Sequence, residues 1–205
     1  MNCRIASFFP LLLVFFLSSA AVVPASASAE IVQHEGKNGL CLNEIGIGTG
    51  YAWGSLKGES GDISVYPAFV RLGFSANSLV GIKSSRNTLQ LTIEPFLNAV
   101  SGPEDGVEAG CALGVRYLHE IASPLALYLE ASVAPMYYSI DTVEQGAAGF
   151  NFLDQFGAGL QYRVAPAMAV FGGYRFRHLS HADLADRSND GINTNALVLG
   201  FSWLY

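Results

Sequence analysis

Residues 45–53 read IGIGTGYAW, and in this stretch every second residue is larger than its neighbours. The odd positions carry isoleucine, threonine and aromatic side chains, whereas the even positions carry only glycine or alanine. A period of two residues indicates a β-strand, because successive side chains of a strand point to opposite faces of the sheet. The same period recurs at residues 89–98 and 125–133, where the odd positions are mostly leucine, isoleucine or valine. The sequence therefore predicts an all-β protein.

Turn-forming residues divide the chain into eight segments of this kind, and the connection at 75–87 is the least well defined. Strands are predicted at 43–55, 62–74, 88–100, 106–120, 125–139, 150–164, 168–181 and 193–205. Most run to 11–15 residues, whereas strands of soluble sheets typically have about five or six. A tilted membrane-crossing strand needs about 9–11 residues. We therefore expect an eight-stranded antiparallel transmembrane β-barrel.

The charged residues of these strands fall on the face opposite the apolar stripe. They are Glu44, Arg71, Glu94, Glu108, Arg116, Glu130, Arg163, Arg175 and Arg177. An eight-stranded barrel is only wide enough to be filled by side chains, so the two signs are predicted to pair in a packed polar interior. A soluble lipocalin-like barrel is the alternative, and it would place the apolar face inside. Here the charged face carries the small residues, which suits the concave side.

Aromatic residues are predicted to gather near the strand ends, on or near the apolar side. They are Tyr51, Trp53, Tyr137, Tyr138, Trp203 and Tyr205. Such girdles mark the two interfaces of membrane barrels. A chain that ends on Trp203, Leu204 and Tyr205 also resembles the terminal strand of bacterial outer-membrane barrels.

The amino terminus and the composition agree with export to a membrane. Residues 1–29 combine Arg4, an apolar run over 8–23 and the small residues Ala27-Ser28-Ala29, which is the three-part pattern of a cleaved signal peptide. A retained anchor is the alternative for this segment. We expect residues 30–205 to form the outer-membrane barrel. Only 14% of the 205 residues are charged and the net charge is −6, which argues against nucleic-acid binding.

The lengths of the connections predict which end of the barrel faces the cell exterior. Short periplasmic turns are typical of these barrels, and the links at 123–124 and 165–166 are the tightest. The longer connections should therefore face outward. They are 56–61, 101–105, 141–149 and 182–192. The strand at 168–181 then ends at the outer leaflet.

That end of the strand carries the candidate catalytic residues. His178 and Ser180 lie two positions apart, so both project from one face of the strand, and the apolar residues of the same parity identify this face as the lipid side. A histidine can act as general base toward a serine nucleophile at this separation. A ring of interfacial polar residues is the alternative interpretation. Asp154 also falls on the lipid-facing parity of its strand, and the sequence suggests no role for it.

The segment YRFRHLSHA at 174–182, followed by NDGIN at 189–193 and a closing apolar strand, resembles the PagL family of lipid A 3-O-deacylases. The resemblance implies an eight-stranded outer-membrane barrel with a Ser-His-Glu triad at its lipid-facing outer rim. His178 would be the base and Ser180 the nucleophile of a serine-type carboxylic ester hydrolase. Lipid A of lipopolysaccharide would be the substrate.

Two positions depart from the family pattern. The family has an asparagine that helps to stabilise the oxyanion where this chain has His181, so the resemblance implies an oxyanion or substrate role for His181. The family has a glutamate where this chain has Asn193, which is then the third expected catalytic residue. An amide can orient the imidazole, but it cannot compensate the charge of an imidazolium. Candidate replacements for the acid lie in the preceding loop and are Asp183, Asp186 and Asp190. The alternative function is a non-catalytic barrel, structural or adhesive, related to this family.

No cofactor, metal site or nucleic-acid partner is expected. His34 and His119 lack partners at metal-ligand spacing. Loss of the signal peptide would leave Cys41 and Cys111, and the sequence leaves open whether they form a disulfide. The expected partners are lipid A, lipopolysaccharide and outer-membrane lipids, and a homodimer is left open.

Overall fold

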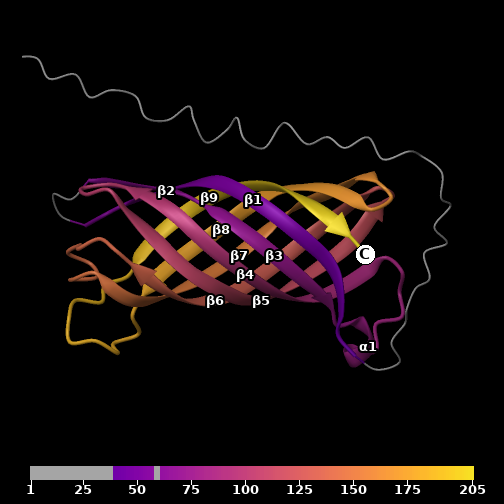
Figure 1. Cartoon of the computed structure of the whole chain (residues 1–205), viewed down its shortest axis with the longest axis horizontal. Coiled ribbons are helices and arrows are strands. Elements are labelled where there is room, and N and C mark those ends of the chain that lie inside the picture. The colour runs from indigo at the N-terminus through magenta and orange to yellow at the C-terminus, as the bar shows by residue number, and fades with distance from the viewer. Residues whose placement is uncertain (1–38, 58–60) are drawn as a thin grey trace, which may run out of the picture. The chain divides into compact units, whose positions relative to one another are not determined.

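The computed structural model describes residues 39–57 and 61–205, so the predicted signal peptide at 1–29 lies outside the described residues. These residues form nine strands and one short helix, α1 (Asn77–Val80). The strands are β1 (Cys41–Ser55), β2 (Asp62–Tyr66), β3 (Ala68–Ser75), β4 (Asn87–Ser101), β5 (Gly106–Ala122), β6 (Leu125–Tyr138), β7 (Gly149–Ala165), β8 (Met168–Ser180) and β9 (Ile192–Leu204). Neighbouring strands are antiparallel, and β1 also pairs with β9. The sheet therefore closes into a barrel (Figure 1).

Strands β2 and β3 together form the single strand that the sequence predicts at 62–74, interrupted at Pro67. Proline has no N–H to donate to a neighbouring strand, so the ladder cannot continue through it. Side chains bridge the break: the Thr49 hydroxyl donates to the Pro67 carbonyl oxygen, and the Ala68 N–H donates to Oδ1 of Asn98. Because β2 and β3 both lie between β1 and β4, the prediction of eight barrel strands is confirmed.

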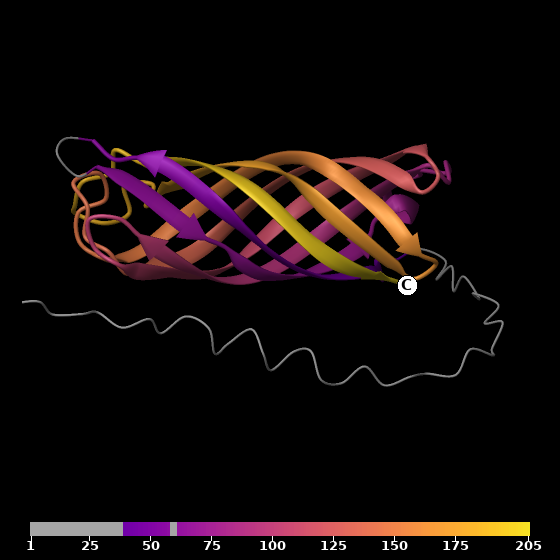
Figure 2. The same cartoon turned by 90° about the horizontal axis from the view of Figure 1, so that it is seen from above.

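The connections separate into a short-turn end and a long-loop end (Figures 1 and 2). The β5–β6 and β7–β8 turns lie at the same end as the carboxyl terminus, where the Tyr205 N–H donates to the Asn43 carbonyl oxygen. The uncertain connection at 75–87 also falls there and contains α1. The longer β6–β7 and β8–β9 loops lie at the opposite end. We call this the outer end, because long loops face outward in such barrels.

Charged residues fill the middle of the barrel, as the alternation predicts. Arg175 contacts two carboxylates, Glu94 at 2.7 Å and Glu130 at 2.6 Å, and Arg116 lies 3.0 Å from Glu44. Four buried arginines lie among four glutamates, of which only Glu130 is partly exposed: Arg71, Arg116, Arg175 and Arg177 face Glu44, Glu94, Glu108 and Glu130. Arg163 is different, because it is exposed and lines a cavity of about 190 Å³ at the short-turn end. Its predicted interior face is confirmed, but Arg163 lies at the open mouth of the barrel and not in the packed interior.

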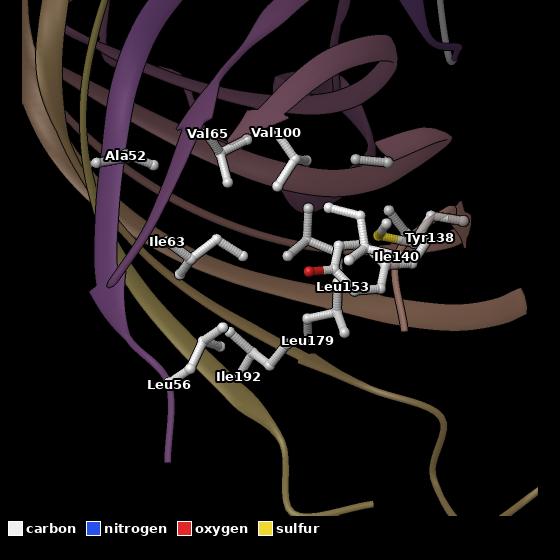
Figure 3. Close-up of a cluster of buried hydrophobic side chains, with 14 residues drawn as sticks. Ala52, Leu56, Ile63, Val65, Val100, Tyr138, Ile140, Leu153, Leu179 and Ile192 are labelled. Carbon is white, nitrogen blue, oxygen red and sulfur yellow. The ribbon is translucent and has the colours of Figure 1, made fainter. Parts of the chain in front are cut away.

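The outer part of the interior is apolar, which the prediction of a polar interior missed. Fourteen buried residues from β1, β2, β4–β9 and the adjoining loops pack together there (Figure 3). Tyr138 belongs to this cluster and is fully buried, so its predicted place in the lipid-facing girdle was wrong. The cluster fills the barrel behind the outer rim and so supports the strand ends from inside.

The outward face is apolar along most of the barrel, and the structure agrees with a membrane-embedded surface. Leu97, Leu113, Leu129, Phe156 and Leu199 are each more than half exposed. Exposed apolar patches of this extent mark surfaces that contact a membrane or a partner.

Cys41 and Cys111 are both free. Among the described helices, none is long and apolar enough to cross a membrane.

Candidate active site

His178 and Ser180 occupy the outer end of β8, on the lipid-facing side. Leu179 lies between them and points into the apolar cluster, with 3% of its surface exposed. This inward anchor fixes the strand, so its two neighbours must project outward. Both outward side chains are partly buried. The structure thus places the predicted base and nucleophile together at the outer rim.

Asn193 on β9 lies directly opposite His178. Its Oδ1 atom is 2.7 Å from Nδ1 of the imidazole. Ile192, the neighbour of Asn193, is buried in the apolar cluster, as Leu179 is on β8. The pairing that joins His178 to Asn193 is therefore held by two apolar residues on the inner side of the wall.

Gly191 is packed against the Cε1 side of the imidazole. A Cβ atom added at this position would lie 2.6 Å from Cε1 of His178 and 3.3 Å from Nε2. Gly191 also has a φ of +76°, which side chains other than glycine rarely adopt. Only glycine therefore fits here without moving the ring or the loop. The His178 ring is turned toward the β9 side of its strand.

The turn that follows Ser180 is strained and is clamped by one side chain. Ala182 and Asp183 both have positive φ values, 52° and 56°, a conformation that costs non-glycine residues roughly 1–2 kcal/mol each. Asn189 holds this turn from two sides. Its Oδ1 accepts from the His181 N–H at 2.9 Å, and its Nδ2 donates to Asp183 at 2.9 Å. Strain that the surroundings hold in place is a common property of active sites.

His181 is fully buried and points into the barrel, away from the lipid-facing site. Its backbone N–H already donates to Asn189, and its Nε2 lies 2.8 Å from the Ser188 carbonyl oxygen. Both groups are hydrogen-bonded within the β8–β9 loop, so the expected role of His181 in stabilising an oxyanion does not fit this structure. The residue instead fixes the base of the β8–β9 loop.

The β8–β9 loop is tied to the other outer loops. Arg187 donates to the carbonyl oxygens of Gln145 at 2.6 Å and Phe150 at 2.7 Å, and also to that of Ala147. Lys57 forms an ion pair with Asp190 at 3.2 Å. These contacts hold the segment that leads into Gly191 and Asn193.

The loop carboxylates considered as replacement acids are placed elsewhere. Asp190 pairs with Lys57 and Asp183 accepts from Asn189, while Asp186 is exposed. None of the three forms a hydrogen bond with His178. The acidic residue that the register does bring next to the imidazole is Asp154 on β7, which pairs directly with His178. The sequence showed that Asp154 falls on the lipid-facing side of its strand, but it did not show that His178 lies beside it.

The site is an open surface and not a cavity. The cavity of about 190 Å³ lies at the short-turn end, and two further cavities inside the barrel measure about 10 Å³ each. Across residues 39–57 and 61–205, no three histidine, cysteine or acidic side chains gather to hold a metal ion. Ser180 and His178 form no direct hydrogen bond here. Such contacts are often long in ligand-free enzymes and shorten when substrate binds.

The closed antiparallel sheet and its apolar outer surface define the chain as an outer-membrane β-barrel. The sequence profile of the lipid A 3-O-deacylase (PagL) family matches residues 66–202, more than half of the chain. The protein belongs to this family, and it is a protein of the bacterial outer membrane.

Two solved structures share the fold. The outer membrane enzyme PagL is 20% identical, with a TM-score of 0.56 over 77% of this chain and 97% of its own. Neisserial surface protein A (NspA) is 15% identical, with a TM-score of 0.57 over 82% of this chain and 100% of its own. A search of curated protein sequences gives no significant match. These comparisons lend no support to the homodimer left open above.

Proposed function

We propose that this protein is an outer-membrane esterase that removes the 3-O-linked hydroxyacyl chain of lipid A, with Ser180 as nucleophile and His178 as general base. Family membership supports the reaction class. The observation that carries the proposal is the position of His178 and Ser180. Both face the lipid at the outer rim, where the glycolipid of the outer leaflet would reach them, and Asn193 holds the imidazole from the next strand.

The reaction would proceed through an acyl-enzyme. The Ser180 oxygen attacks the ester carbonyl carbon while Nε2 of His178 takes the hydroxyl proton. The bond between that carbon and the sugar oxygen then breaks, and His178 returns the proton to the departing oxygen. In the second half, His178 takes a proton from water, the hydroxide attacks the acyl-serine, and the fatty acid leaves as Ser180 is reprotonated.

The test is release of 3-hydroxy fatty acid from lipid A in detergent, measured by mass spectrometry. Ser180→Ala and His178→Ala should each lower turnover by about a thousandfold or more, and the double variant should lose little beyond either single one. Ser101→Ala is the matched control, because Ser101 is an exposed serine at the outer end of β4. Ser180→Ala with undiminished turnover would overturn the assignment of the nucleophile.

One observation favours the second candidate function, a non-catalytic barrel. Asn193 occupies the place of the family's acid, and an amide there does not compensate the imidazolium charge. In that case the wild-type protein would release no fatty acid above the level of a protein-free control. The same mass-spectrometric assay therefore separates the two functions.

A further inference from the structure

Asp154 is an acidic residue on the lipid-facing side of β7 and is the sixth residue of the strand, counted from its outer start. Its neighbours on the same face of β7 are Phe152 and Phe156, and its partner on β6 is Val133, which is 45% exposed. All three are apolar. A carboxylate in this position costs free energy, because neither lipid nor hydrocarbon side chains solvate its charge.

The remaining direct neighbour of Asp154 is His178. The two residues are paired across β7 and β8, and side chains directly opposite each other in antiparallel strands have Cβ atoms about 4.5–5.5 Å apart. They form no hydrogen bond, since the imidazole is turned toward Gly191 and Asn193. An effect of the carboxylate on the ring must therefore act through space, and such interactions are stronger at an apolar boundary than in water.

The other groups around the imidazole carry no charge. From β9 it meets the amide of Asn193, from the loop before β9 it meets Gly191, and its neighbour on β8 is Ser180. The nearest loop acids are bound elsewhere, Asp190 by Lys57 and Asp183 by Asn189. Asp154 is thus the acidic group that the strand register itself places beside His178.

We propose that Asp154 is a positioning residue that compensates the charge of His178 during catalysis, an inference that rests on the proposed deacylase function. In a Ser-His-acid triad one carboxylate both orients the imidazole and stabilises the imidazolium. Here the two tasks are divided between two strands. Asn193 on β9 orients the ring, and Asp154 on β7 supplies the negative charge. The proton moves only between Ser180, His178 and the leaving oxygen, and Asp154 takes no part in the transfer.

The test compares turnover of lipid A by Asp154→Asn, Asp154→Glu and the wild type. Asp154→Asn should lower kcat about a hundredfold and leave KM within about threefold, because the charge acts on the transition state more than on substrate binding. Asp154→Glu should recover most of the loss. Asp186→Asn, which removes the same charge from the exposed outer loop, should leave both constants unchanged.

A second comparison uses Asn193→Glu, which places a carboxylate on the other side of the imidazole. In the wild-type background the charge is already present, so the gain should stay below about threefold. In the Asp154→Asn background the same change should raise kcat about tenfold or more, because it restores the missing charge. This dependence on background is not expected of a purely structural residue.

The outcomes separate the two proposals. If the wild type is active and Asp154→Asn has the same kcat as the wild type, the role of Asp154 is overturned but the deacylase function stands. A gain of tenfold or more from Asn193→Glu in the wild type would also overturn it, even if Asp154→Asn failed to fold. A wild type without any deacylation would overturn both.

Discussion

Nδ1 of His178 lies 2.7 Å from Oδ1 of Asn193, on the strand that follows it around the barrel. An amide oxygen only accepts hydrogen bonds, so the proton of the neutral imidazole must sit on Nδ1. Nε2 is then unprotonated, as a general base requires. The relationship fixes the tautomer of His178 without any charge on its partner.

Asn193→Ala should therefore lower kcat by about 10- to 100-fold, because the ring loses the acceptor that selects its tautomer. Asn195→Ala is the matched control. Asn195 lies two residues further along β9, but its Oδ1 accepts from the Tyr174 hydroxyl and not from His178. The kcat of lipid A deacylation is measured for both variants by mass spectrometry. Equal losses in the two would show that Asn193 has no special relation to the imidazole.

Gly191→Ala should lower kcat/KM about a hundredfold, because the new methyl group would push the His178 ring out of place and small displacements of reacting groups are costly. Gly81→Ala is a fitting control. Gly81 has a φ of +72°, close to the +76° of Gly191, but an added Cβ there meets nothing within 4 Å. Gly81→Ala introduces the same backbone strain without a new contact, so it should keep full activity. Full activity of Gly191→Ala would contradict the close packing on the ring.

Glu108→Gln should reduce the free energy of unfolding by about 3–5 kcal/mol, because it leaves Arg177 buried without its counterion. Both side chains of this ion pair are 3% exposed. The double variant Glu108→Gln/Arg177→Met should recover a large part of the loss, since neither charge then remains buried. Urea unfolding in detergent provides the measurement. If the double variant is less stable than Glu108→Gln, the ion pair contributes more to the stability of the barrel than the cancellation of two buried charges.

Much of the architecture follows from local pattern. The alternation at 45–53 and 125–133, the strand lengths and the spacing of turns determine a barrel with charges inside, because a strand has a side-chain period of two. The same parity placed His178 and Ser180 on the lipid side. Tyr138 was assigned to the wrong face, and Arg163 lies at the mouth of the barrel instead of its packed interior. The surroundings of residues near a strand end depend on the loops and the mouth of the barrel, and not only on alternation along the strand.

The sequence by itself determined the all-β class, the number of barrel strands and the face on which His178 and Ser180 lie. It also carried the motif that relates the chain to its family. Tertiary structure decided which residues stand beside that pair. Asp154, His178 and Asn193 are 24 and 15 positions apart in sequence, and only the register of β7, β8 and β9 sets them side by side. Register depends on turns, bulges and inward packing of the whole barrel, so no local pattern reveals it.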